Sequence, residues 1–313
     1  MLSPDGYWET RQLRAMGSTA EVIVGLGHDR LVDWAVAEIE RLEQSWSRFR
    51  ADSELRCLVA RGGTWVSVSA DLFDALTRAR VLWHRTAGAF DPTIALALES
   101  IGYDRSFEVV ARDLDEPWSS PSFGPVPGFG LVELDDDAGA VRVPEGVGLD
   151  LGGIGKGLAA DLVAEGLVLR GAASALVELG GDIRTAGEVP EGGWWVPVRD
   201  PFDASSAASV AALGSEAIVT STSLMRRWRR GGRDLHHIID PLDGAPAESG
   251  VVAVVARGPE AWWAEGLAKA AMILGEHAAD ALLEGTGVSA TLYLSDRREV
   301  LVSGITVPAC SPH

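Results

Sequence analysis

The stretch that most constrains the fold of this chain is L-D-L-G-G-I-G-K-G-L-A-A-D, at residues 149–161. Its four glycines alternate with Ile154 and Lys156, and an apolar pattern typical of a helix follows. Glycine permits a sharp turn and lets a ligand approach the backbone N–H groups. A helix that begins here directs unpaired donors and its positive dipole end at the turn. The stretch therefore predicts an anion site, with phosphate as the natural guest.

Two charged residues of this stretch, Lys156 and Asp150, lie next to its glycines. Lys156 would add a positive charge to a bound phosphate. Asp150, just before the glycines, either bonds a ligand or braces the turn. The glycine spacing is neither G-x-G-x-x-G nor G-x-x-x-x-G-K-[ST], so neither nucleotide motif is indicated. The alternative interpretation is a tight strand-to-helix turn with one solvated lysine.

Composition excludes several classes of protein. With 313 residues, 47% of them hydrophobic and 23% charged, the chain is long enough and apolar enough for a globular core, which disfavours disorder and membrane spanning. A formal net charge of −18 argues against a nucleic-acid partner, whose phosphates need a basic face. Its only two cysteines, Cys57 and Cys310, are far apart and indicate neither a metal cluster nor a disulfide framework.

The first residues, M-L-S-P-D-G-Y-W-E-T, contain no cationic start, no apolar segment and no cysteine for lipid attachment. A secretory signal needs the first two of these features. For the sequence as written we therefore expect a cytoplasmic protein without a membrane partner.

Hydrophobic periodicity predicts both helices and strands, which follow one another along the chain without a regular alternation. The expected helices span residues 28–48, 71–86, 158–169 (an amphipathic helix) and 259–274, with a short helix after Asp52 or Ser53. The expected strands and hairpins span residues 14–25, 64–68, 132–143, 175–179, 194–199, 217–220, 251–255 and 290–305. Residues 205–213, rich in serine and alanine, are expected to lead into a strand. Residues 102–127 lose periodicity and predict a surface excursion or a lid.

His237 is the best candidate for a general base, because its ordinary pKa lies near neutrality and the carboxylate of Asp240 follows closely. The alternative is a core histidine bonded to the backbone. His236 is an equal candidate for the site, although strand alternation would place the two rings on opposite faces.

Other polar residues have two interpretations each. Asp91, in A-F-D-P-T, either holds a ligand's hydroxyl or ring N–H, or closes its own turn. Asp182, after two glycines, is expected to be a turn residue. The arginines between residues 226 and 230 predict a solvated face, with a docking site for an acidic partner as the alternative.

Taken together, these motifs resemble the ApbE family, the FAD:protein FMN transferases, from about residue 7 to residue 306, which we treat as a single domain. The motifs occur in the family's order: M-G-S-T, W-S-R-F-R-A-D-S-E-L, T-A-G-A-F-D-P-T, D-L-G-G-I-G-K-G-L-A-A-D, L-V-E-L-G-G-D-I-R and H-I-I-D-P-L-D-G-A-P. The resemblance implies an α+β fold of two antiparallel sheets flanked by helices, with FAD in a cleft between them. It also implies Mg²⁺ on the pyrophosphate, and transfer of FMN from FAD to a threonine of a target protein with release of AMP.

The resemblance also implies roles for individual residues. The flavin site would be lined by Met16 and Phe49, the latter standing where the family commonly has tyrosine. FAD would be held by Ala89, Phe90 and Asp91. The diphosphate region would be bound by Asp150, Gly153 and Lys156, with the Gly153 carbonyl facing the metal. His237 and Ile238 would lie beside the reacting phosphorus and the adenosine. The base for the incoming hydroxyl would be His237 or a nearby carboxylate such as Asp240.

The chain departs from this family at the metal site. The family motif A-D-A-L-A-T-A-L, whose aspartate and threonine bind Mg²⁺, reads A-E-G-L-A-K-A-A here, so Glu265 replaces the aspartate and Lys269 the threonine. An ammonium cannot be a ligand to a cation, so we expect Mg²⁺ to bind weakly or not at all. Either Lys269 stands in for the metal, or it pairs with Glu265 on a helix surface, a contact worth ~0.3–0.5 kcal/mol.

A second departure is Thr222, which stands where the family usually has glycine and could crowd the cleft. Two rival functions stay open at this point. One is a non-catalytic FAD-binding protein with a degenerate metal site, and the other is a pyrophosphatase that splits FAD to FMN and AMP without an acceptor.

Overall fold

The computed structural model describes residues 8–25, 29–110 and 121–304. Four sequence predictions therefore lie partly outside the described residues: the start of the first helix at residue 28, the middle of the segment 102–127, the last residue of the range 290–305, and the two ends of the domain 7–306.

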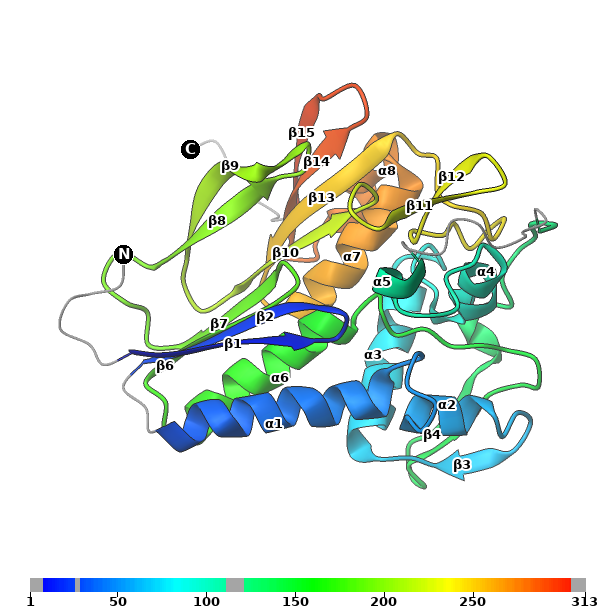
Figure 1. The fold of residues 1–313 in the computed structure, drawn as a ribbon, viewed down its shortest axis with the longest axis horizontal. Coiled ribbons are helices and arrows are strands. Elements are labelled where there is room, and N and C mark those ends of the chain that lie inside the picture. Colours follow the sequence, from blue (N-terminus) through cyan, green and yellow to red (C-terminus); the bar gives the residue numbers. More distant parts are fainter. Residues whose placement is uncertain (1–7, 26–28, 111–120, 305–313) are drawn as a thin grey trace, which may run out of the picture.

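An eight-stranded antiparallel sheet organises the fold (Figure 1). Its strands lie in the order β1-β2-β6-β7-β10-β13-β14-β15. Their bounds are Trp8–Ala15, Ser18–Gly25, Ser174–Leu179, Asp182–Gly187, Ala217–Thr222, Val251–Gly258, Ser289–Leu294 and Glu299–Ser303. The region predicted as one strand at residues 14–25 is the end of β1 and all of β2, joined by a two-residue turn in which Met16 and Gly17 both have positive φ. This turn places Met16 at one edge of the site described below.

Two apolar helices, α6 (Gly155–Leu169) and α7 (Ala261–Leu274), pack against one face of this sheet (Figure 1). The prediction that α6 is amphipathic was wrong, because most of its residues are buried between the sheet, α7 and α1 (Asp29–Trp46). Within α6 only Glu165 and Leu169 are exposed. The helices approach closely. A Cβ on Gly157 would lie 2.6 Å from the backbone of Ala261, and one on Gly166 would lie 2.4 Å from the ring of Trp34. Glycine is therefore needed at these crossings.

The other face of the sheet is covered by a hairpin of β8 (Trp194–Asp200) and β9 (Asp203–Leu213). A separate apolar cluster joins them, with sheet residues such as Ile218 and Val255 packed against Trp194 and Val196. Sequence reasoning missed β9, because serine and alanine carry little strand propensity.

The remaining elements form a smaller body beside the sheet. Its helices are α2 (Glu54–Val59), α3 (Ala70–Arg85), α4 (Ala95–Ser100) and α5 (Phe107–Val110), with 3-10 turns at Pro92–Ile94 and Phe129–Leu131. Its strands are β3 (Trp65–Ser67), β4 (Glu133–Asp135) and β5 (Ala140–Arg142) in one small sheet, and β11 (Arg227–Arg230) with β12 (Arg233–His236) in another. Helix α8 (Glu276–Leu283) follows α7.

Several local predictions are confirmed. Ser53 accepts a hydrogen bond from Arg56 N and so caps α2, the short helix that the sequence indicated. Ser69 accepts from Leu72 N and caps α3 in the same way. The hairpins of β4 with β5 and of β14 with β15 correspond to the expected ranges 132–143 and 290–305. The α+β class is also confirmed, with most of the β structure in one large sheet and the rest in smaller ones. Among the described residues, no helix combines the length and the hydropathy needed to cross a bilayer.

Candidate functional site

The glycine turn leads directly into α6, which begins at Gly155 without a side-chain cap. Asp150 Oδ1 accepts a hydrogen bond of 2.5 Å from Gly152 N, so Asp150 does brace the turn. A Cβ on Gly153 would lie 2.6 Å from Cε2 of Phe90, which leaves no room for a side chain there. The turn thus lies against a buried aromatic ring at Gly153, while Gly152 and Gly155 line the cavity described next.

A cavity of about 220 Å³ opens beside this turn. It brings together the turn between β1 and β2, the end of α1, the loop after α4 and the start of α6. Four of the residues expected to bind cofactor line it: Met16, Phe49, Asp150 and Lys156. Aromatic rings and positive charges are both part of the lining, from Trp46, Tyr103, Phe107, Arg48 and Arg226.

Arg48 connects the end of α1 to the glycine turn. Its Nε lies 2.6 Å from Asp150 Oδ2, and its Nη2 donates to the carbonyl oxygen of Tyr103 at 2.6 Å. The guanidinium also lies over the rings of Phe49 and Tyr103, at 4.1 and 4.7 Å from their centroids. Only 6% of the Arg48 side chain is exposed. Arg48 therefore fixes both the turn and the aromatic wall of the cavity.

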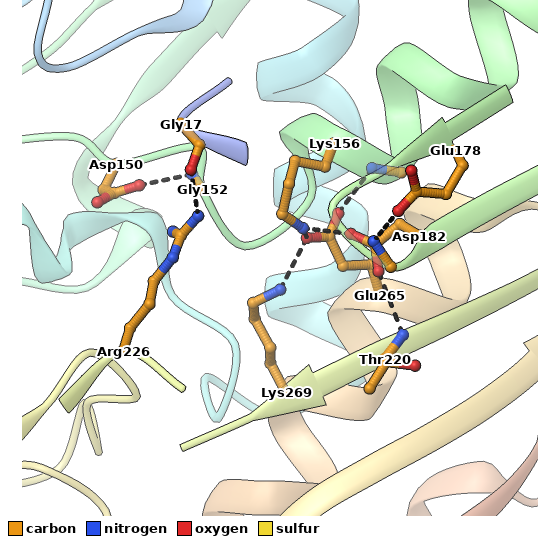
Figure 2. Close-up of polar contacts among 12 residues, drawn as sticks. Gly17, Asp150, Gly152, Lys156, Glu178, Asp182, Thr220, Arg226, Glu265 and Lys269 are labelled. Atoms are coloured by element: carbon orange, nitrogen blue, oxygen red, sulfur yellow. Dashed lines mark hydrogen bonds and ion pairs between the residues drawn. The ribbon is translucent and has the colours of Figure 1, made fainter. Parts of the chain in front are cut away.

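Arg226 reaches the cavity from the segment between β10 and β11 (Figure 2). Its guanidinium donates to the carbonyl oxygen of Gly17 at 3.2 Å and lies 3.4 Å from the hydroxyl of Tyr103. Arg226 is half-buried, so the prediction of a solvated arginine face holds only in part for this residue. It was wrong for Arg230, which is buried, whereas Arg227 and Arg229 are exposed, as alternation along β11 requires.

Four charged side chains meet at the start of α6, and we call them the four-residue network: Lys156, Asp182, Glu265 and Lys269 (Figure 2). Glu265 Oε1 accepts from Lys156 Nζ at 2.6 Å and from Lys269 Nζ at 2.8 Å, while Oε2 accepts from Gly157 N at 2.9 Å. Asp182 pairs with Lys156 and accepts from Thr220 N, so it is more than the turn residue that the sequence indicated.

Burial decides how this network is interpreted. Glu265 and Asp182 have no exposed side-chain surface, whereas 16% of Lys156 and 15% of Lys269 is exposed. Lys269 and Glu265 do pair, but the prediction of a helix-surface pair was wrong, because the carboxylate is fully buried and shared with a second lysine. Burial alone would raise the pKa of Glu265, but the two ammonium groups outweigh it and hold this pKa below its usual value.

These residues do not fit a magnesium ion. Mg²⁺ requires oxygen ligands at roughly 2 Å in near-octahedral order. The Glu265 oxygens already accept three hydrogen bonds, two of them from cations. Among residues 8–25, 29–110 and 121–304, no group of three or more His, Cys, Asp and Glu side chains is arranged to hold a metal.

The two histidines differ in their surroundings. His237 lies behind the cavity wall, with its ring centroid 6.5 Å from that of Tyr103. Its Nδ1 is shielded from solvent and has no hydrogen-bond partner among the described residues. Burial, and then the positive charges of Arg226 and Lys269, hold the pKa of His237 well below its ordinary value. His236 Nδ1 accepts from Ile238 N at 3.3 Å, so the ring of His236 bonds its local backbone.

Four expected site residues are bonded to their own surroundings or buried in the core. Both Asp91 oxygens are engaged: Oδ1 accepts from the backbone and hydroxyl of Thr93, and Oδ2 from Trp83 Nε1 and Phe129 N. Ile238 and Ala89 are buried in the core. Asp240 accepts from Leu242 N in its own turn and lines another depression, of about 850 Å³, that includes neither His237 nor Lys156. No hydrogen bond joins Asp240 to His237 in the described part of the chain.

Sequence reasoning missed Arg48, Tyr103 and Arg226 as cavity residues. A signal for Arg48 was present, because it lies between two aromatic residues, Trp46 and Phe49, in the segment W-S-R-F-R. The other two come from loops and became neighbours of the glycine turn only through folding.

A family model and individual relatives of known name point to the same family. The family model described as the ApbE family matches residues 16–292. The FAD:protein FMN transferase of Treponema pallidum is 33% identical over 281 residues, covering 85% of this chain and 78% of that protein. The enzyme of the same name from Rhodobacter capsulatus is 30% identical over 83% of this chain, which spans about half (49%) of that relative.

Solved structures agree in fold. The ApbE protein of Thermotoga maritima superposes with a TM-score of 0.83 at 25% identity, covering 95% of this chain and 97% of that one. The flavin transferase ApbE from Vibrio cholerae superposes with a TM-score of 0.77 at 24% identity, covering 96% and 98%.

Proposed function

The chain belongs to the ApbE family, and from that premise we propose that it transfers the FMN half of FAD to a threonine side chain of an acceptor protein. The main support for this proposal is the lining of the cavity, which contains the aromatic rings of Phe49 and Tyr103 together with Lys156 and the glycine turn. A flat heteroaromatic group joined to a diphosphate needs both kinds of surface.

The reaction is a phosphoryl transfer. The threonine oxygen forms a bond to the phosphorus of the FMN half while the phosphoanhydride bond breaks. AMP leaves with the bridging oxygen, and the hydroxyl proton passes to a base. Such transfers depend mainly on positioning and on charge stabilisation, and require little from the base.

We assign the hydrogen bond with the incoming hydroxyl to His237. Because its pKa is held well below the ordinary value, this ring is neutral at neutral pH and accepts a proton through one nitrogen. The absence of any hydrogen-bond partner for its Nδ1 among the described residues supports this assignment. Asp240, the alternative base, accepts a hydrogen bond from Leu242 N in its own turn.

The experiment is an incubation of the chain with FAD and an acceptor domain that carries a flavinylation threonine. We expect a fluorescent adduct that survives a denaturing gel, together with an equal amount of AMP. The matched control is the same acceptor with Thr→Ala, which should give neither product.

The rival functions predict different outcomes. A pyrophosphatase would release AMP from FAD with the Thr→Ala acceptor as readily as with the original. A non-catalytic binder would bind FAD and release no AMP with either acceptor. Either result would refute the transferase.

A further inference from the structure

Lysine is used sparingly in this chain. Of its 27 basic residues other than histidine, only two are lysines, Lys156 and Lys269, and the other 25 are arginines. Both lysines donate to one oxygen atom, Glu265 Oε1. A compact ammonium differs from a guanidinium in placing its charge at a point with three rotatable donors. The chain therefore has lysine only where two positive point charges meet beside the glycine turn.

The network holds these two charges in place. Asp182 and Glu265 are inaccessible to solvent, so they anchor the ammonium groups from the inner side. The exposed surface of the network belongs to the lysines, and Lys156 lines the cavity. Charges positioned before the ligand arrives stabilise a developing negative charge without a cost of reorganisation.

Charge balance shows what Lys269 contributes to the network. With two ammonium and two carboxylate groups, the network is neutral in sum. A cation at Glu265 Oε1 would have to displace Lys269 and would then face Lys156. If Lys269 were a neutral residue, the network would carry a net negative charge and one carboxylate oxygen would lose a donor. Lys269 thus fills the place in which a cation would otherwise balance Glu265.

We propose that Lys269 and Lys156 together supply the positive charge for the FAD diphosphate, so that this chain binds FAD and transfers FMN without a divalent metal. The inference rests on the proposed function, since it concerns the same cavity and the same reaction. The phosphate oxygens accept from the two ammonium groups, and these neutralise charge on the non-bridging oxygens as AMP leaves.

The first test measures FAD binding by the unmodified chain, from flavin fluorescence, in EDTA and then with Mg²⁺ added. We expect the Kd to change by less than about twofold. Binding that becomes tenfold tighter with Mg²⁺ overturns the inference, even if the covalent adduct forms. An unchanged Kd with no adduct on any acceptor supports the role of the lysines and refutes the transferase function instead.

A second measurement reports on the site without activity. Labelling with ¹⁵N-lysine gives two backbone amide resonances, because the chain contains two lysines. In EDTA we expect FAD to shift both resonances, and Mg²⁺ added alone to shift neither. A shift on adding Mg²⁺ alone, or no shift with FAD, contradicts the proposal.

The variant Lys269→Thr tests the charge balance directly. We expect its affinity for FAD in EDTA to fall about ten- to hundredfold, the worth of a hydrogen bond to a charged group, and Mg²⁺ to restore most of it. The control Arg229→Thr removes the same charge from an exposed position on β11 and should leave the affinity unchanged. Equal affinities of Lys269→Thr and the unmodified chain in EDTA would overturn the proposal.

Discussion

The guanidinium of Arg48 lies 2.6 Å from the carboxylate of Asp150, and this ion pair ties the last residues after α1 to the glycine turn. Only 6% and 12% of the two side chains is exposed. The pair therefore fixes the position of the glycine turn relative to the rings of Phe49 and Tyr103, over which the Arg48 guanidinium also lies.

Removing one partner of this pair should destabilise the protein strongly. For Asp150→Ala we expect the free energy of unfolding to fall by about 3 kcal/mol, because an almost buried charge loses its partner. The double variant Arg48→Met, Asp150→Ala should lose less than the two single variants combined. Chemical denaturation of the four proteins measures this, and strict additivity would contradict the coupling.

Glycines of the motif should differ in their tolerance of alanine. Gly157→Ala places a Cβ 2.6 Å from the backbone of Ala261, and we expect a loss of about 2 kcal/mol or more. Gly155→Ala is the matched control, since the nearest atom to its added Cβ is Cε3 of Trp46 at 4.0 Å. Its stability should stay within about 0.5 kcal/mol or rise, as helix propensity favours alanine. Thermal unfolding distinguishes them.

Phe49 should contribute to FAD affinity without contributing much to folding. Its side chain is 41% exposed in the cavity wall, where Arg48 covers one part of it. For Phe49→Ala we expect FAD to bind about tenfold more weakly, because an aromatic contact of ~1 kcal/mol or more is lost with the buried area. Phe49→Tyr should bind normally. A fluorescence titration that gives equal Kd values for all three proteins would contradict this role.

His237 should act on the transfer step and not on binding. For His237→Asn we expect the rate constant for adduct formation to fall about 10²-fold, within the usual range for a lost proton acceptor, while the Kd for FAD changes little. Single-turnover adduct formation and fluorescence titration separate the two quantities. Weaker FAD binding with an unchanged rate constant would assign His237 to the binding surface instead.

His236 should make the protein less stable in acid. Burial, and then the charge of Arg227, lower the pKa of His236 from 6.5 to about 4. Below pH 6.5 the unfolded chain binds a proton that the folded chain does not bind until about pH 4. From pH 7.5 to pH 5, we expect the unmodified protein to lose about 1–2 kcal/mol of stability relative to His236→Gln. Denaturation curves at both pH values would show a constant difference if the prediction is wrong.

Local features of the fold were predictable because neighbouring residues decide them. Ser53 and Ser69 cap helices that begin at the next residue, and the turn between β4 and β5 depends on the few residues between them. The α+β class followed from the motifs and their order. The strand β9 was missed because its serines and alanines form a strand only when paired with β8 and packed on the sheet.

Burial was harder to predict than secondary structure. Helix α6 was taken to be amphipathic, but it packs on the sheet, α1 and α7 together. Asp91 had two interpretations in the sequence, and the structure gives its carboxylate four protein donors. Whether a polar side chain has a free oxygen depends on groups from other elements, and those are not encoded in its own motif.

The sequence by itself determined that glycines and Lys156 would form a turn at the start of a helix, because that turn needs only adjacent residues. Only the tertiary structure decided what the lysine meets. Glu265, 109 residues further on, reaches Lys156 because the missing side chain of Gly157 lets α7 lie against α6. The pairing of distant charges depends on how closely and in which direction helices pack, and this is a property of the assembled core.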